Sequence, residues 1–128
     1  MATLLVTDGP AAGEKFALEQ HNLVLVGRDA SCTFQIIDPQ LSRGHLQVKF
    51  VEGEGRHHAI DFGSKNGVFV NGASVAGDGV VLSDRDVIKI GGTTIVYTTD
   101  DSLDAQHVRE AMKMFGQNHV ETMEAEVD

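Results

Sequence analysis

The sequence is poor in aromatic residues, proline and cysteine, and it contains no long apolar run. Tryptophan is absent, aromatic residues make up 5% of the 128 residues, and only 2 prolines and 1 cysteine occur. A membrane-spanning helix needs roughly 20 consecutive apolar residues, so we expect no membrane association. The lone Cys32 cannot form an internal disulfide, and no basic region precedes the first apolar run, Leu4 to Val6, as a signal peptide requires. We therefore expect a cytoplasmic protein.

Positive charge is also scarce. The chain has 10 lysines and arginines against 19 acidic residues, and its net charge is −9. Much of the excess lies after residue 97, where 8 acidic and 2 basic residues occur. Sequence-independent binding to nucleic acid depends on many cations that neutralise phosphates, so we expect no nucleic-acid partner. A small, local anion site remains compatible with this balance.

The first 98 residues have a sequence pattern that is typical of short strands joined by tight turns. β-branched residues are frequent, and turn signals recur about every 8–12 residues or fewer. Apolar and polar residues alternate from Leu46 to Phe50, which is typical of a half-buried strand. This pattern predicts an all-β, antiparallel sandwich. The pair Gly91-Gly92 lies between two alternating runs and predicts a hairpin.

The composition changes at residue 99, and we assign residues 1–98 to one domain and residues 99–128 to an acidic tail. Part of the tail has apolar residues on roughly one helical face, and Gly116 ends the pattern. This predicts an amphipathic helix over about 103–115. Packing on the domain is its expected role, and docking of a partner is the alternative. The apolar positions are Leu103, Val108, Ala111, Met112 and Phe115.

Three basic residues of the domain lie in or beside turns that contain glycine. They are Arg28 in "GR", Arg43 in "SRG" and Lys65 in "SKNG". The arginine fork fits phosphate oxygens, while serine hydroxyls and backbone N–H groups near glycine complete anion pockets. If a sandwich brings these loops to one end, they form a compact phosphate site. Three unrelated surface cations are the alternative, and spacing alone does not decide between them.

Other patterns give no support for catalysis or for a metal site. Ser42 and His45 are three residues apart, but no strand–turn–helix elbow surrounds the serine as a hydrolase nucleophile requires. His57 and His58 are neighbours on a predicted strand, so they point to opposite faces, and no third ligand is apparent. We therefore expect a protein that is not an enzyme and that uses no metal and no cofactor.

Four short motifs, in order along the chain, closely resemble those of the forkhead-associated (FHA) domain. The resemblance covers about Thr3 to Tyr97, and the opening "TDGPAAGEKFAL" is similar to the start of bacterial members. It implies a β-sandwich of about eleven strands that binds phosphothreonine-containing segments through loops at one end. The motifs are Gly27-Arg28, Ser42-Arg43-Gly44-His45, Asn66-Gly67 and Asn71-Gly72.

The resemblance implies roles for particular residues. Arg28 looks like the arginine that contacts the phosphate, Ser42 looks like the hydroxyl donor, and Arg43 resembles a second cation in the same loop. Asn66 looks like the residue that hydrogen-bonds the peptide backbone. The implied phosphopeptide-binding set is Arg28, Ser42, Arg43, Ser64, Lys65 and Asn66. The implied structural support of the binding loops is Gly27, Gly44, His45, Gly67 and Asn71.

Two positions depart from the family pattern. Members often have threonine where Lys65 stands, so this chain exchanges a hydroxyl for a point charge. We therefore expect acidic residues near the phosphothreonine to be favoured. Arg85 stands where a glycine is usual, and its distance in sequence from the motifs leads us to expect a neutral effect.

These observations together predict a non-catalytic, phosphothreonine-dependent protein-binding module in Ser/Thr kinase signalling. Its expected partner is a phosphothreonine-containing protein or peptide, including a Ser/Thr kinase or the substrate of one. The alternative is a phosphate-independent scaffold or assembly module that uses a sandwich face and the C-terminal helix. A second alternative concerns Thr98, Thr99 and Thr122, whose phosphorylation would let the tail occupy the site of its own domain.

Overall fold

The computed structural model describes residues 2–18, 22–100, 104–108 and 110, and the strands of the fold lie within them. They are β1 (Thr3–Asp8), β2 (Lys15–Ala17), β3 (Leu23–Gly27), β4 (Phe34–Gln35), β5 (Leu46–Val51), β6 (Arg56–Asp61), β7 (Val68–Val70), β8 (Ala73–Ser74), β9 (Val80–Val81), β10 (Asp86–Ile90) and β11 (Thr93–Thr98).

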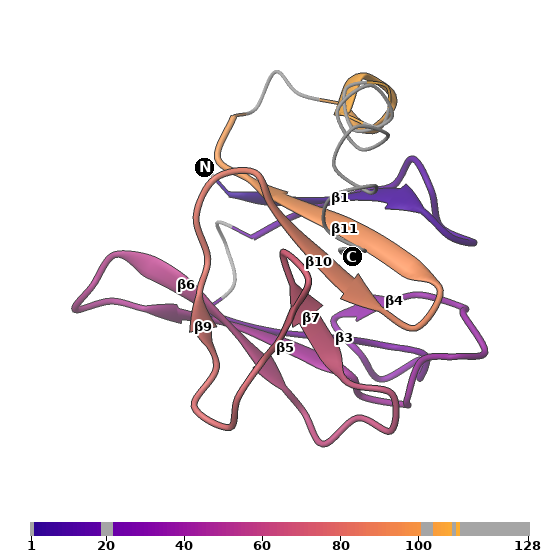
Figure 1. Ribbon diagram of the computed structural model, residues 1–128, viewed down its shortest axis with the longest axis horizontal. Coiled ribbons are helices and arrows are strands. Elements are labelled where there is room, and N and C mark those ends of the chain that lie inside the picture. Colours follow the sequence, from indigo (N-terminus) through magenta and orange to yellow (C-terminus); the bar gives the residue numbers. More distant parts are fainter. Residues whose placement is uncertain (1, 19–21, 101–103, 109, 111–128) are drawn as a thin grey trace.

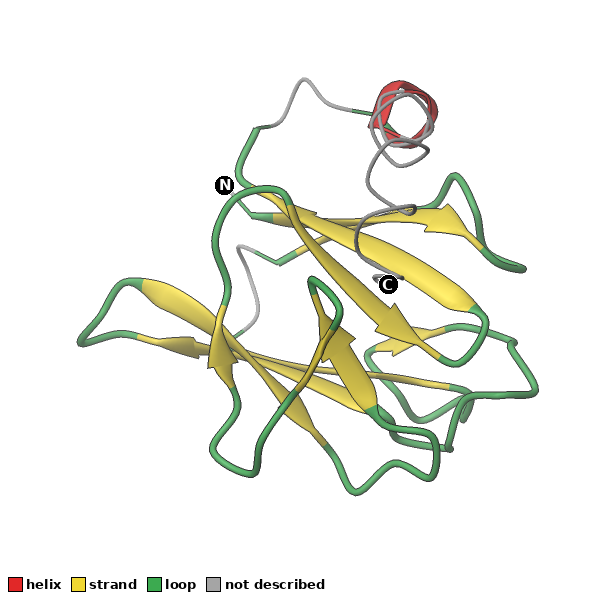
Figure 2. Ribbon diagram, viewed as in Figure 1, coloured by secondary structure: helices red, strands yellow, loops and turns green. Residues whose placement is uncertain are grey.

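The strands form two sheets that lie against each other (Figures 1 and 2). A 6-stranded sheet has the order β2-β1-β11-β10-β7-β8, and a 5-stranded sheet has the order β4-β3-β5-β6-β9. The pairing is antiparallel between the described strands except for β3 and β4, which run parallel. The predicted all-β sandwich is therefore confirmed. So is the hairpin at Gly91-Gly92, where Ile90 pairs with Thr93.

The core lies between the two sheets and follows the alternation that the sequence contains. Val26 in β3, Leu46 in β5 and Ile88 in β10 are fully buried, whereas Lys49 and Lys89 on the same strands are exposed. Successive side chains of a strand point to opposite faces, so β5 and β10 bury one face and leave the other outside, whereas β11 is buried on both faces. This packing fixes the strand ends from which the loops project.

The turn between β7 and β8 depends on the dipeptide Asn71-Gly72. Both residues have positive φ, 52° and 85°, as a two-residue type I′ hairpin turn requires. The Asn71 side chain accepts a hydrogen bond from the Val87 backbone N–H at 2.9 Å and donates one to Asp86 Oδ1 at 3.0 Å. Asn71 therefore ties this turn to β10, which fits the structural role implied for it.

The described part of the tail packs on the outer face of the six-stranded sheet. Residues 105–108 and 110 are helical, and they lie beside β1 and β11 in Figure 1. Val108 is 9% exposed and joins an apolar cluster with Leu5 and Val96. The Asp104 carboxylate accepts a hydrogen bond from the His107 backbone N–H at 2.8 Å, as an N-cap does. The rest of the predicted helix, including Leu103, Met112 and Phe115, lies outside the described residues. No helix among the described residues is long and apolar enough to cross a membrane.

Arg85, in the turn before β10, has a φ of 76°, in the left-handed region. In this region a residue with a Cβ is destabilised by about 1–2 kcal/mol. Arg85 therefore strains the backbone of its turn and is not neutral for stability. We predict that Arg85→Gly raises the free energy of unfolding by on the order of 0.5–1 kcal/mol, because glycine adopts this conformation readily. Its exposed ion pairs with Asp84 and Asp100, both at 3.8 Å, contribute little. Urea denaturation measures the difference.

Asn71→Gly is the matched control, because Asn71 also has a positive φ but uses its side chain in two hydrogen bonds. This substitution should lower the free energy of unfolding by about 1 kcal/mol, as expected for lost hydrogen bonds. Equal shifts of the same sign in the two variants would contradict the explanation.

Candidate functional site

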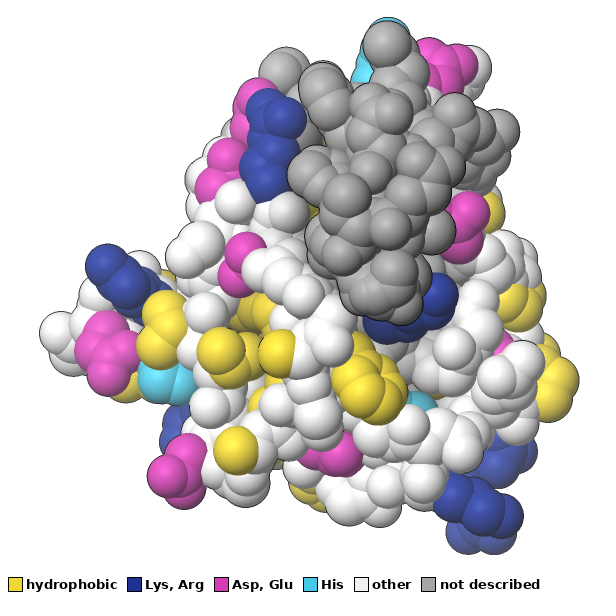
Figure 3. Space-filling view, in the orientation of Figure 1, with side chains coloured by type: hydrophobic (Ala, Val, Ile, Leu, Met, Phe, Trp, Pro, Cys, Tyr) yellow, Lys and Arg dark blue, Asp and Glu magenta, His cyan; other side chains and the backbone are white. Residues whose placement is uncertain are grey.

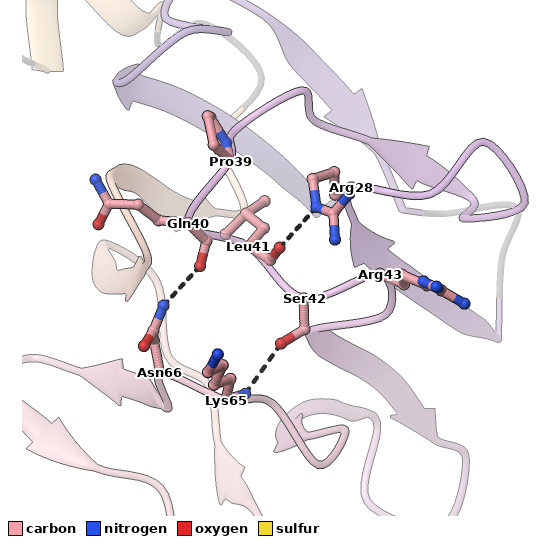
Figure 4. Close-up of a pocket in the computed structure, with 8 residues that line it drawn as sticks. All are labelled: Arg28, Pro39, Gln40, Leu41, Ser42, Arg43, Lys65 and Asn66. Carbon is pink, nitrogen blue, oxygen red and sulfur yellow. Dashed lines mark hydrogen bonds between the residues drawn. The ribbon is translucent and has the colours of Figure 1, made fainter.

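Three loops meet at one end of the sandwich and enclose a pocket of about 520 Å³ (Figure 4). They follow β3, connect β4 to β5, and connect β6 to β7. Five of the six predicted binding residues line the pocket, and Ser64 does not. Three further lining residues were not predicted from the sequence, although they directly precede Ser42 in the same loop: Pro39, Gln40 and Leu41. The lining residues are Arg28, Pro39, Gln40, Leu41, Ser42, Arg43, Lys65 and Asn66.

Arg28 follows the last residue of β3 and is held in place by the neighbouring loop. Its backbone N–H donates to the Ser42 carbonyl at 3.1 Å, and its Nε donates to the Leu41 carbonyl at 3.0 Å. Among the described residues, its terminal amino groups have no hydrogen-bond partner. Arg28 can therefore present these two groups, but not Nε, to an anion.

Gly27 permits this arrangement because the 42–44 segment crosses directly over it. A Cβ built on Gly27 would collide with the Arg43 carbonyl oxygen and lie 2.9 Å from the Gly44 Cα. These are backbone atoms, so they have little freedom to move aside. The glycine is required here by close approach of two chain segments.

Two hydrogen bonds join the β4–β5 loop to the β6–β7 loop (Figure 4). Ser42 Oγ accepts from the Lys65 backbone N–H at 2.9 Å, and Asn66 Nδ2 donates to the Gln40 carbonyl at 2.8 Å. Since the Ser42 oxygen acts as an acceptor in this bond, its hydroxyl hydrogen can be donated elsewhere. The pocket therefore combines the Arg28 amino groups with a hydroxyl donor.

His45 lies behind the pocket, fully buried, and connects the same two loops. Its Nδ1 accepts from the Ser42 backbone N–H at 3.0 Å, so the ring proton sits on Nε2, which donates to the Gly67 carbonyl at 2.8 Å. Nδ1 can accept a hydrogen bond only while it carries no proton, so the two bonds together correspond to the neutral ring. This geometry fits the bracing role that the resemblance implies, and it gives His45 no access to a reacting group.

Ser64 closes the turn that carries Lys65 and Asn66. Its Oγ accepts from the Gly67 backbone N–H at 2.9 Å, and its own N–H donates to Asp61 Oδ1 at 2.8 Å. Gly67 has a φ of 88°, which favours glycine. Ser64 thus shapes the loop, and its hydroxyl oxygen faces the turn.

The cations of the site lack direct acidic partners. Among the described residues, none of Arg28, Arg43 and Lys65 has a carboxylate oxygen within 4.0 Å. Asp29 follows Arg28 in sequence, but its carboxylate accepts hydrogen bonds from the Ser31 hydroxyl and backbone N–H. These bonds, with smaller effects of the two arginines, hold the pKa of Asp29 below its ordinary value. The Arg43 side chain extends away from the pocket centre (Figure 4).

Comparison with known proteins identifies the class of this fold and site. The sequence model of the FHA domain matches residues 24–91. This range is more than half of the chain and includes the four motifs and all three pocket loops. The chain therefore belongs to the FHA domain family.

Similar individual proteins are also known. Glycogen accumulation regulator GarA of Mycolicibacterium smegmatis is 34% identical over 103 residues, which are 80% of this chain and 62% of GarA. The chain thus spans less than two thirds of this relative. The FhaA FHA domain, solved in complex with the intracellular domain of Rv3910, superposes with a TM-score of 0.66 at 29% identity, over 76% of this chain and 99% of that chain. A structure from a study of phosphothreonine-dependent FHA domain interactions has a TM-score of 0.65 at 27% identity, over 77% and 96% of the two chains.

The buried His45 gives a test of how the loops are held. We predict that His45→Ala lowers the free energy of unfolding by about 2–5 kcal/mol, because it leaves the Ser42 N–H and the Gly67 carbonyl without partners. Urea denaturation measures the loss. The control is His58→Ala. The partly exposed His58 ring pairs with Glu54 at 2.8 Å, and its loss should lower the free energy of unfolding by less than about 1 kcal/mol. Similar losses in both variants would show that His45 does not hold the loops.

Proposed function

We propose that this protein is a non-catalytic, phosphothreonine-dependent protein-binding module that acts in Ser/Thr kinase signalling. The observation that carries the proposal is the pocket in which a serine hydroxyl adjoins cations that have no acidic partner among the described residues, in a chain whose net charge is −9. Membership of the FHA domain family supports a binding role and gives no support to an enzyme. We also propose a cytoplasmic location, where kinases would act on its partners.

The chemistry of the site suits a phosphate on a peptide. A phosphothreonine carries about −1.5 to −2 charges and three acceptor oxygens at neutral pH. The terminal amino groups of Arg28 and the hydroxyl of Ser42 would donate to these oxygens, and Asn66 would hold the adjacent peptide backbone. We propose Arg43 and Lys65 as outer cations, and Ser64 as the residue that shapes their loop. The partner would be a phosphothreonine-containing protein, including a Ser/Thr kinase or its substrate.

The surface gives further support for a local anion site. On the face shown in Figure 3, lysine and arginine side chains lie in separate small groups, with acidic side chains near several of them. A broad basic surface, as nucleic-acid binding uses, is not seen on this face. Val108 is already buried against Leu5 and Val96, so this position is not available to a partner. The first observation gives no support to nucleic-acid binding, and the second favours the phosphopeptide site over an assembly module built on the helix.

The central test is a titration of a phosphothreonine peptide against its unphosphorylated twin by calorimetry. Low-micromolar affinity, about −8 kcal/mol, would suit reversible signalling. We predict that Arg28→Ala weakens phosphopeptide binding by on the order of 2–5 kcal/mol, because the phosphate loses its charged partner. The matched control is Arg56→Ala. Arg56 is exposed and lies at the start of β6, whereas the pocket loop follows the end of that strand, so this variant should bind the phosphopeptide as the unmodified protein does. If Arg28→Ala and Arg56→Ala bind the phosphopeptide with equal affinity, Arg28 is not part of the binding site.

Lys65 allows a separate test of peptide preference. Its backbone N–H, not its side chain, bonds to Ser42, so Lys65→Thr should leave the loop in place. We predict that the preference for acidic residues beside the phosphothreonine falls by about 0.2–1 kcal/mol per acidic residue, the range for exposed charge pairs. A phosphopeptide library screened against both proteins measures this. An unchanged preference would show that the lysine charge does not select the peptide.

A further inference from the structure

Asp38 is a buried carboxylate that the proposed binding chemistry does not use. It is 2% exposed and begins the segment that carries Pro39 to Ser42 into the pocket. Its Oδ1 accepts from the Gln40 backbone N–H at 2.9 Å. Its Oδ2 accepts from the Gly92 backbone N–H at 2.9 Å and from the Thr93 hydroxyl at 2.8 Å. One side chain therefore joins the pocket loop to the β10–β11 hairpin of the opposite sheet.

These hydrogen bonds continue to Asn66. Asp38 holds the N–H of Gln40, and the carbonyl of Gln40 accepts from Asn66 Nδ2 at 2.8 Å. A connected series thus runs from Thr93 through Asp38 and Gln40 to the residue proposed to hold the peptide backbone. The phosphate-contacting groups are fixed by other bonds, since Arg28 is held by Leu41 and Ser42 by His45.

The hairpin also touches the pocket loop directly. A Cβ on Gly91 would lie 2.9 Å from Leu41 Cδ2 and 3.0 Å from Gln40 Cβ, so the two segments already meet closely. Gly91 also has a φ of 52°. The hairpin end is therefore a back wall for the segment that Asp38 anchors.

Asp38 remains ionised in this setting. Burial alone would raise the pKa of its carboxyl group, but the hydrogen bonds from Gln40, Thr93 and Gly92 outweigh burial and lower the pKa. An ionised acceptor forms shorter and stronger hydrogen bonds than a neutral one. The link between the hairpin and the loop therefore consists of charge-assisted hydrogen bonds.

We propose that Asp38 and Thr93 are positioning residues that set the orientation of Asn66, and so tune recognition of the peptide backbone rather than of the phosphate. This inference rests on the proposed phosphopeptide function. It assigns peptide discrimination in part to a hairpin of the other sheet, which contributes no residue to the pocket lining. Coupling of this kind between linked positions typically changes affinity by about 2- to 30-fold.

The test replaces the Thr93 hydroxyl without changing the side-chain shape. We expect Thr93→Val to weaken binding of a phosphothreonine peptide by about 3- to 30-fold, while binding of free phosphothreonine changes less than twofold. Thr93→Ser, which keeps the hydroxyl, should restore peptide binding. The control is Thr94→Val on the same strand, because the Thr94 hydroxyl forms no hydrogen bond with the described residues. Calorimetry measures the peptide, and an NMR titration measures free phosphothreonine.

A double-mutant cycle with Asn66→Ala distinguishes positioning from general loss of stability. If Thr93 acts through Asn66, Thr93→Val should have little further effect in the Asn66→Ala background. Additive losses, or equal losses for the peptide and free phosphothreonine, would overturn the inference. Should Thr93→Val fail to fold, Asp38→Asn, which has the same shape, replaces it in the cycle. If the unmodified protein does not distinguish the phosphopeptide from its unphosphorylated twin, the proposed function fails and the inference falls with it.

Discussion

The site depends on the hydrogen bonds that His45 makes behind it. This buried, neutral ring accepts from Ser42 and donates to Gly67, so one side chain fixes the relative position of two loops. Without it, two backbone groups would be buried unpaired, which costs more than a typical hydrogen bond contributes. The bonds from Lys65 to Ser42 and from Asn66 to Gln40 can form only when the loops already have this spacing. The pocket loops are thus held in place by the hydrogen bonds of the protein itself, which would leave little ordering to oppose the binding of a ligand.

Much of the fold was accessible from the sequence because strand alternation and glycine turns are local signals. The sandwich and the Gly91-Gly92 hairpin follow from them. The hairpin of β7 and β8 was not predicted, although the dipeptide Asn71-Gly72 at its turn is a strong hairpin signal. The parallel pairing of β4 with β3 was also missed, because strand pairing is not a property of either segment alone. The positive φ of Arg85 was missed too, although the glycine that is usual at this position is a local signal for it.

The candidate site, like the fold, was predicted only in part from the sequence. Its cations and serine were found from glycine-containing turns, and their convergence was implied by resemblance to a family. Asp38 gave no signal, since a carboxylate in a loop usually faces water. Its importance depends on Gly92 and Thr93, and Thr93 lies 55 residues away in sequence. Hydrogen bonds between residues so far apart in sequence depend on how the two sheets pack. This packing cannot be predicted from single segments of the sequence.

The strands at the sheet edges have a further consequence. The edges are formed by β2, β8, β4 and β9, and each has only two or three residues. An exposed edge strand offers unpaired backbone groups that can recruit strands from other chains, and short edges limit this. A protein that binds partners through loops benefits from edges that bind nothing. In a fold whose candidate site lies in loops at one end, short edge strands therefore limit sheet extension along the sides and so protect against aggregation.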